Sequence, residues 1–194
     1  ILSLIAVYRI SDVVMGIMAN PFYVDMGFTK SEVAAVSKLY GVIMTLVGAF
    51  VGGALAMRLG VMRVLMLGAV LSAASNLLFA WLAQQAPSVT ALVLIVSADN
   101  LAGGIASAAF IAYLSSLTRV QYSATQYALL SGVYAISSKV LAAPSGLLVK
   151  LLGWEHFFLL SAAAAVPAFL LMVLVTPWRE EQARGAYRGT EAAD

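Results

Sequence analysis

The chain has 194 residues, of which 62% are hydrophobic and 10% charged, and its mean hydropathy is +0.96. Soluble domains carry roughly 25% charged residues, so a water-facing globule is excluded and lipid is the expected solvent. The net charge of +2 with scattered basic residues argues against a nucleic-acid partner. Without cysteine, and with His156 as the single histidine, we expect no metal centre or cofactor.

Apolar runs long enough to cross a bilayer, about 20 residues each, define the predicted elements. They lie at 1–19, 32–57, 64–82, 91–117, 124–149 and 155–176. β-Barrel strands would instead need alternating runs of about ten residues. The sequence therefore predicts an all-α membrane protein with a six-helix transmembrane bundle over 1–176. Because the first run starts at Ile1 without a methionine, we expect a fragment that begins within a transmembrane helix and is preceded by further sequence.

The basic residues outside the predicted spans set the expected orientation, since cytoplasmic loops are enriched in Lys and Arg. Lys30 and Lys150 fall on one side. Six arginines fall on the other side: Arg58, Arg63, Arg119, Arg179, Arg184 and Arg188. We therefore expect both ends of the fragment in the cytoplasm, with 177–194 as a disordered tail of mixed charge.

Five ionisable residues lie inside the predicted spans, namely Arg9, Asp12, Lys38, Asp99 and Lys139. Each costs about 2.5–3.5 kcal/mol at mid-bilayer on insertion scales, so such groups normally face a protein interior or a hydrated cavity. If all five line one cavity, they carry a surplus of one positive charge and favour an anionic ligand. Asp12 and Asp99, as the carboxylates at that depth, are then the candidates for proton coupling.

Purely structural roles for these charges stay open. Arg9 and Asp12, spaced i, i+3, can simply neutralise each other. Lys38 and Lys139 can snorkel to the interface. Asp99 and Lys139 can form a structural salt bridge.

Four predicted helices carry a stripe of small or polar residues at helical spacing. The stripes are Arg9, Asp12, Gly16 and Asn20 in the first, Lys38, Gly41, Thr45, Gly48 and Gly52 in the second, Gly68, Ser72, Ser75, Asn76 and Phe79 in the third, and Tyr127, Ser131, Tyr134, Ser138 and Ser145 in the fifth. Such stripes either line a cavity or pack helices closely, and the Gly48-xxx-Gly52 pair in particular allows close helix contact.

The segment "GGALAMRLGVMR" (52–63) resembles the loop motif of the major facilitator superfamily. Gly53, Arg58, Gly60 and Arg63 match the motif, whereas its acidic position holds Met57 and further basic positions hold Val61 and Met62. The resemblance implies a gating role for this loop, weakened by the missing acid. It also implies that the chain is the C-terminal six-helix half of a twelve-helix transporter, with a missing N-terminal half as its partner.

Longer segments resemble the AmpG-type muropeptide permeases. They are "YRISDVVMGIMANPFYVDMGFTKSEVA" (8–34), "KLYGVIMTLVGAFVGG" (38–53), "SADNLAGGIASAAFIAYLSSLT" (97–118) and "YSATQYALLSG" (122–132). The resemblance implies proton-coupled import of N-acetylglucosaminyl-anhydro-N-acetylmuramyl peptides across the bacterial inner membrane, for cell-wall recycling and β-lactamase induction. The alternative is transport of another anionic solute, such as acetyl-CoA or a sugar phosphate.

Under that resemblance the candidate site residues take specific roles. Arg9, Lys38 and Lys139 would hold carboxylates of an anionic glycopeptide. Asn100 is a further candidate for binding the substrate. The aromatic candidates for stacking on sugar faces are Tyr113, Tyr127 and Tyr134. A membrane enzyme would need a nucleophile and base constellation, which the sequence does not offer, so we predict a transporter and not an enzyme.

Overall fold

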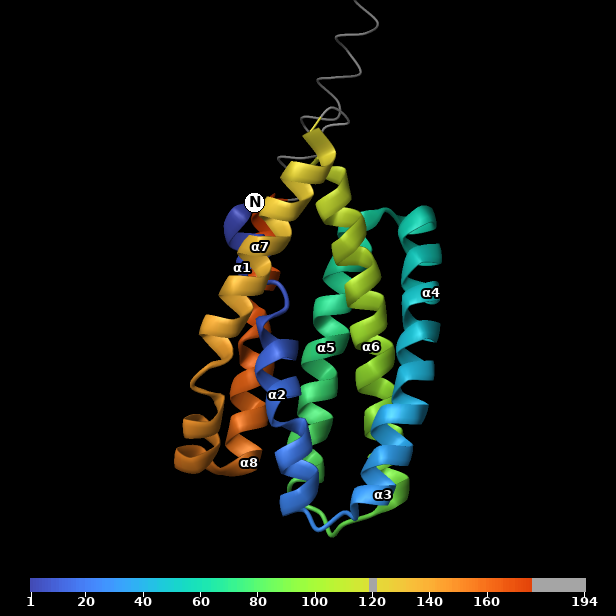
Figure 1. Cartoon of the computed structure of the whole chain (residues 1–194), viewed down its shortest axis with the longest axis vertical. Helices are drawn as coiled ribbons and strands as arrows, with labels where there is room; N and C mark the ends of the chain where they lie inside the picture. The colour runs from blue at the N-terminus through green and yellow to red at the C-terminus, as the bar shows by residue number, and fades with distance from the viewer. Residues whose placement is uncertain (119–121, 176–194) are drawn as a thin grey trace, which may run out of the picture.

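The computed structural model describes residues 1–118 and 122–175, and within these ranges it contains helices and no β-strand. The helices are α1 (Leu2–Val7), α2 (Ile10–Asp25), α3 (Lys30–Val33), the π-helix η1 (Ala34–Tyr40), α4 (Gly41–Leu59), α5 (Val61–Leu82), α6 (Val89–Ser116), α7 (Ser123–Ala142) and α8 (Ser145–Ala163), followed by a helical segment at 165–175. The long helices run side by side as a bundle (Figure 1). The predicted tail at 177–194 lies outside the described residues.

Five segments are long and apolar enough to cross a membrane: Leu2–Asp25, Lys30–Leu59, Val61–Leu82, Val89–Ser116 and Ser145–Val175. Helix α7 is not among them, because Thr125, Gln126 and several serines dilute its apolar residues. It nevertheless packs within the bundle, against α1 and α2.

The chain reverses direction within α8, at Gly153. This glycine has φ +77° and ψ 172°, a backbone conformation that side chains with a Cβ rarely adopt. Helix α7 runs from one end of the bundle to the other and continues into the first part of α8, and the chain then returns after Gly153 (Figure 1). The turn falls inside "KLLGW" (150–154), which separates the last two predicted spans.

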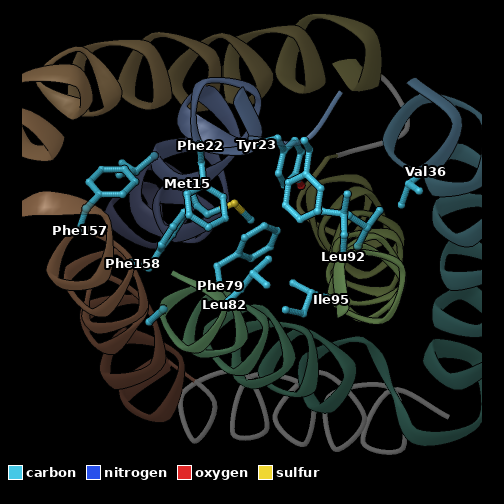
Figure 2. Close-up of a cluster of buried hydrophobic side chains, with 14 of the residues drawn as sticks. Met15, Phe22, Tyr23, Val36, Phe79, Leu82, Leu92, Ile95, Phe157 and Phe158 are labelled. Carbon is cyan, nitrogen blue, oxygen red and sulfur yellow. The ribbon is translucent and has the colours of Figure 1, made fainter. Parts of the chain in front are cut away.

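The first membrane segment differs from the predicted span in two ways. It is broken between α1 and α2, and it continues to Asp25 although Pro21 lies inside α2. Phe22 and Tyr23, just after the proline, are buried in an aromatic cluster with Phe79 and Phe158 (Figure 2). The Phe22 and Phe158 rings are 4.8 Å apart between centroids. This packing holds the last turn of α2 in place, and Gly27, at φ +88°, follows its end.

Helices α4 and α6 pack backbone against backbone. A Cβ added to Gly52 would lie 2.8 Å from Ile105 Cα, and one added to Gly48 would lie 3.0 Å from Leu101 Cα. A Cβ on Gly104 of α6 would meet Thr45 O and lie 2.7 Å from Ala49 N. The prediction of close helix contact at Gly48 and Gly52 is confirmed, so this part of the stripe packs against α6.

Candidate functional site

The break in the first membrane segment positions the first charged residues of the site. Helix α1 ends at Val7 with Tyr8 as its C-cap, and Arg9 has φ −105° and ψ 16° before α2 begins at Ile10. The buried Tyr8 side chain donates a hydrogen bond from Oη to Leu65 O at 2.9 Å and stacks on Phe110 at 5.2 Å. Non-helical backbone at membrane depth occurs where it faces protein or a water-filled cavity, and broken helices of this kind build transporter sites.

Arg9 and Asp12 form an ion pair across one turn at the start of α2. Arg9 Nη2 lies 3.1 Å and Nε 3.2 Å from Asp12 Oδ2, and the two side chains are 22% and 17% exposed. This is the only ion pair among the described residues. Arg9 and Asp12 therefore do neutralise each other, as considered above. Both side chains also border a cavity.

That cavity, of about 190 Å³, lies between α2, α4 and α6. Its lining residues are Arg9, Asp12, Met15, Gly16, Thr45, Asp99, Asn100, Gly103 and Ser107. The structure thus brings Asp99 to the same space as Asp12 and Arg9, although these residues are far apart in the sequence. Asp99 Oδ1 accepts a hydrogen bond from Ser75 Oγ of α5 at 2.9 Å.

The cavity holds fewer cations than the sequence suggested. Lys38, on the π-helix η1, and Lys139, on α7, are exposed and do not border it. Lys139 forms no ion pair with Asp99 within the described ranges. One cation therefore faces two carboxylates, so the expected surplus of positive charge does not apply to this cavity. With both carboxylates ionised, its lining carries a net charge of −1.

Asn100 links α6 to α4 through a hydrogen bond at the wall of the cavity. Its Oδ1 accepts a hydrogen bond from Thr45 Oγ1 at 2.9 Å, and its Nδ2 donates to Val96 O at 2.8 Å. Both polar groups of the Asn100 side chain thus already form hydrogen bonds within the protein. Asn100 is therefore placed to stabilise the contact between α6 and α4, and it also borders the cavity as a candidate for binding the substrate.

The three candidate tyrosines lie outside the cavity. Tyr113 is 0% exposed within a cluster that also contains Tyr8 and Phe110, so its ring is not accessible for stacking on a sugar. Tyr127 and Tyr134 of α7 are half-buried against the same cluster, and the Tyr134 ring meets Phe110 edge-on at 5.1 Å.

The predicted gating loop is reduced to one residue, Gly60, between α4 and α5. Gly60 has φ +87° and ψ 149°, which explains a glycine in this part of the motif. Arg58 and Arg63 on either side are exposed, and a Cβ on Gly53 would meet no atom within 4 Å.

A second polar network, which sequence patterns revealed only in part, joins three helices beside the cavity. Asn76 Nδ2 of α5 donates to Ser11 Oγ at 2.7 Å, and Ser11 Oγ donates to Ser161 O of α8 at 2.7 Å. All three residues are buried. Asn76 belonged to a predicted stripe, whereas Ser11 and Ser161 gave no signal beyond being serines in apolar runs.

With this geometry described, comparison with known proteins places the chain in a family. Residues 1–193 match the Major Facilitator Superfamily. The chain belongs to the Major Facilitator Superfamily. Membership confirms the predicted all-α fold class of a multi-pass membrane protein, and it indicates part of a transporter rather than part of an enzyme.

Individual relatives and one solved structure are similar to most of this chain. The chain is 38% identical over 177 residues to "Putative transporter AmpG 4" of Rickettsia conorii, covering 91% of this chain and 43% of that protein. It is 35% identical over 175 residues to "Anhydromuropeptide permease" of Escherichia coli K12, covering 90% and 36%. The inward-open xylose transporter XylE from E. coli superposes with a TM-score of 0.60 at 18% identity, covering 89% of this chain and 45% of XylE. The chain thus spans less than half the length of these relatives.

Proposed function

We propose that this chain forms the C-terminal half of a proton-coupled importer of muropeptides in the bacterial inner membrane. The carrying observation is that Asp12 and Asp99, from different helices, border one cavity together with Arg9. The AmpG and anhydromuropeptide permease names of the relatives support the substrate class. Transport of a cell-wall fragment would serve recycling and β-lactamase induction.

The charge balance of the cavity supports the proposed proton coupling. Binding one proton at either carboxylate changes the net charge of its lining from −1 to 0. The proton occupancy of such a group depends on its distances to the neighbouring carboxylate and to the guanidinium. A conformational change that alters these distances would therefore take up or release a proton, which is the requirement for coupling.

The cavity of about 190 Å³ is too small for a disaccharide with a peptide, so we propose that it serves the proton and that the substrate binds mainly elsewhere. Lys38 and Lys139 are exposed in this chain and available to carboxylates of an anionic glycopeptide. Tyr127 and Tyr134 are only half-buried, so part of each side chain is accessible for contact with a sugar. The rest of the site would come from the N-terminal half.

We also propose that both ends of the fragment face the cytoplasm. The N-terminus and the turn between α4 and α5 lie at the same end of the bundle (Figure 1). That turn carries the exposed Arg58 and Arg63. Lys30 and Lys150 belong to segments at the opposite end (Figure 1), as the charge asymmetry requires.

The test measures uptake of labelled muropeptide by the complete transporter in right-side-out vesicles under an imposed pH gradient. We expect Asp99→Asn and Asp12→Asn to abolish gradient-driven uptake, because neither amide can bind the coupled proton. Asp25→Asn is the matched control, since this exposed carboxylate at the end of α2 only accepts a hydrogen bond from Trp154 Nε1 and the amide retains an acceptor.

Gradient-driven uptake that is unchanged in both cavity variants would refute the coupling role. Competition by unlabelled muropeptide, acetyl-CoA and sugar phosphates then identifies the substrate. Inhibition by acetyl-CoA or a sugar phosphate, and not by muropeptide, would refute the proposed substrate while leaving a transporter of another anionic solute.

A further inference from the structure

Ser75 of α5 is the direct hydrogen-bond partner of Asp99, and it has two acceptors within reach. Its Oγ lies 2.9 Å from Asp99 Oδ1 and 2.9 Å from the carbonyl oxygen of Ser72 on the preceding turn. A serine hydroxyl has one hydrogen, so it donates fully to one of these acceptors at a time. Ser75 is 2% exposed, so water does not readily replace either partner.

The two acceptors match the two protonation states of Asp99. When Asp99 is ionised, Ser75 donates its hydrogen to the carboxylate. When Asp99 is protonated, the carboxyl hydrogen can be donated to Ser75 Oγ, and the Ser75 hydrogen rotates to the Ser72 carbonyl. Ser75 keeps its own hydrogen throughout, and the only proton gained or lost is the one on Asp99.

We propose that Ser75 is a positioning residue that gives Asp99 a hydrogen-bond partner in both protonation states, by turning one hydroxyl between Asp99 and the Ser72 carbonyl. The inference deepens the proposed function, because it rests on Asp99 changing its protonation during transport. The Asp99 carboxyl group therefore keeps its hydrogen bond to α5 when the proton binds, without a movement of either helix.

Other charged and titratable groups also act on Asp99 and must be held constant in a test. Arg9 and Asp12 of α2 face it across the cavity, and Tyr23 of α2 lies within range of its charge. Helix α4 contributes the uncharged Thr45 to the same cavity. A substitution at Ser75 changes none of these charges, so its effect on Asp99 comes through the hydroxyl.

Removing the hydroxyl should penalise the ionised state more than the protonated state. Hydrogen bonds to an ionised acceptor are roughly twice as strong as those between neutral groups. In Ser75→Ala the ionised form of Asp99 therefore loses more hydrogen-bond stabilisation than the protonated form does. We expect the protonation midpoint of Asp99 in this variant to move to higher pH, by about one pH unit.

Infrared difference titration of the purified complete transporter measures this directly and needs no substrate. The carboxyl C=O band of Asp99 is assigned by its loss in Asp99→Asn. In Ser75→Ala we expect that band at a higher frequency, because its hydrogen bond is lost, and a titration midpoint at higher pH. Ser75→Thr, which keeps the hydroxyl, should restore both.

Ser72→Ala is the matched control on the same helix, since only the Ser72 backbone carbonyl takes part. If Ser75→Ala does not fold, Ser75→Cys, with its weaker thiol donor, should shift the midpoint in the same direction by less. A wild-type band and midpoint in the Ser75 variant that folds would overturn the inference. Wild-type protein that transports no muropeptide but titrates as expected would instead refute only the proposed function.

Discussion

Helix α6 meets α4 and α2 in opposite ways. Towards α4 its contact is made by Gly104 against the backbone of Thr45 and Ala49, with no room for a single added carbon. Towards α2 it is separated by a polar cavity, which Asp99 borders from α6 and Arg9 and Asp12 border from α2. One contact is closed by main-chain atoms, and the other is left open and lined with charge.

The difference indicates which part of the bundle can change during transport. Closely packed backbones have few alternative arrangements, so α4 and α6 should move as one body. Under the proposed proton coupling, the polar cavity between α2 and α6 gains and loses charge, and it adjoins the break at Tyr8 and Arg9. We therefore expect conformational change to concentrate on the α2 side of α6.

The largest effect should come from filling the α4–α6 contact. Gly104→Val places a branched side chain against the α4 backbone, so we expect a loss of about 3 kcal/mol or more in the free energy of unfolding, measured in detergent. Gly103→Ala is the matched control on the neighbouring residue, where a Cβ would meet no atom within 4 Å. A Gly104→Val protein as stable as Gly103→Ala would show that the contact is not closed.

A smaller effect is expected from the ion pair on the α2 side. Arg9→Gln leaves Asp12 without its partner, which should cost about 2 kcal/mol, less than for a fully buried pair because both side chains keep some exposure. The double variant Arg9→Gln/Asp12→Asn should recover most of that loss in the same unfolding measurement. Lys150→Gln, at an exposed site, serves as the control for lost charge. No recovery in the double variant would contradict a coupled pair.

The smallest effect on stability is expected at Thr45, which contacts α6 and also borders the cavity. Thr45→Val keeps the side-chain volume but removes the hydroxyl that donates to Asn100 Oδ1, which should cost about 1 kcal/mol in unfolding free energy. Thr45→Ser keeps the hydroxyl and should lose less. Equal losses in the two variants would assign the effect to packing of the threonine methyl group and not to the hydrogen bond.

The sequence predicted those features that carry a large free-energy cost in lipid or that follow from residue spacing. Ionisable residues are expensive in lipid, so hydropathy alone assigns Arg9, Asp12 and Asp99 to an interior. The Gly48 and Gly52 spacing predicted the close contact with α6. The length of the apolar runs predicted the all-α fold class.

Features that depend on distances between helices could not be predicted. Lys38 and Lys139 were indistinguishable from Arg9 by hydropathy, yet they are exposed outside the cavity. The broken first helix contains no glycine or proline at Tyr8 and Arg9 to reveal it. Ser75 acquires its role only because α5 places it 2.9 Å from Asp99.

The central claim, that charged side chains of α2 and α6 face a hydrated space, can be tested by labelling with a membrane-impermeant thiol reagent. The chain has no cysteine, and any elsewhere in the complete transporter would be replaced first. Ser107→Cys, nearly the same size as the native residue at the cavity wall, should be labelled in at least one of the inward-open and outward-open states. Leu94→Cys, on the same helix at an apolar side chain that is 66% exposed and does not border the cavity, should stay unlabelled. An inert Ser107→Cys in both states, or equal labelling of the two sites, would contradict the account.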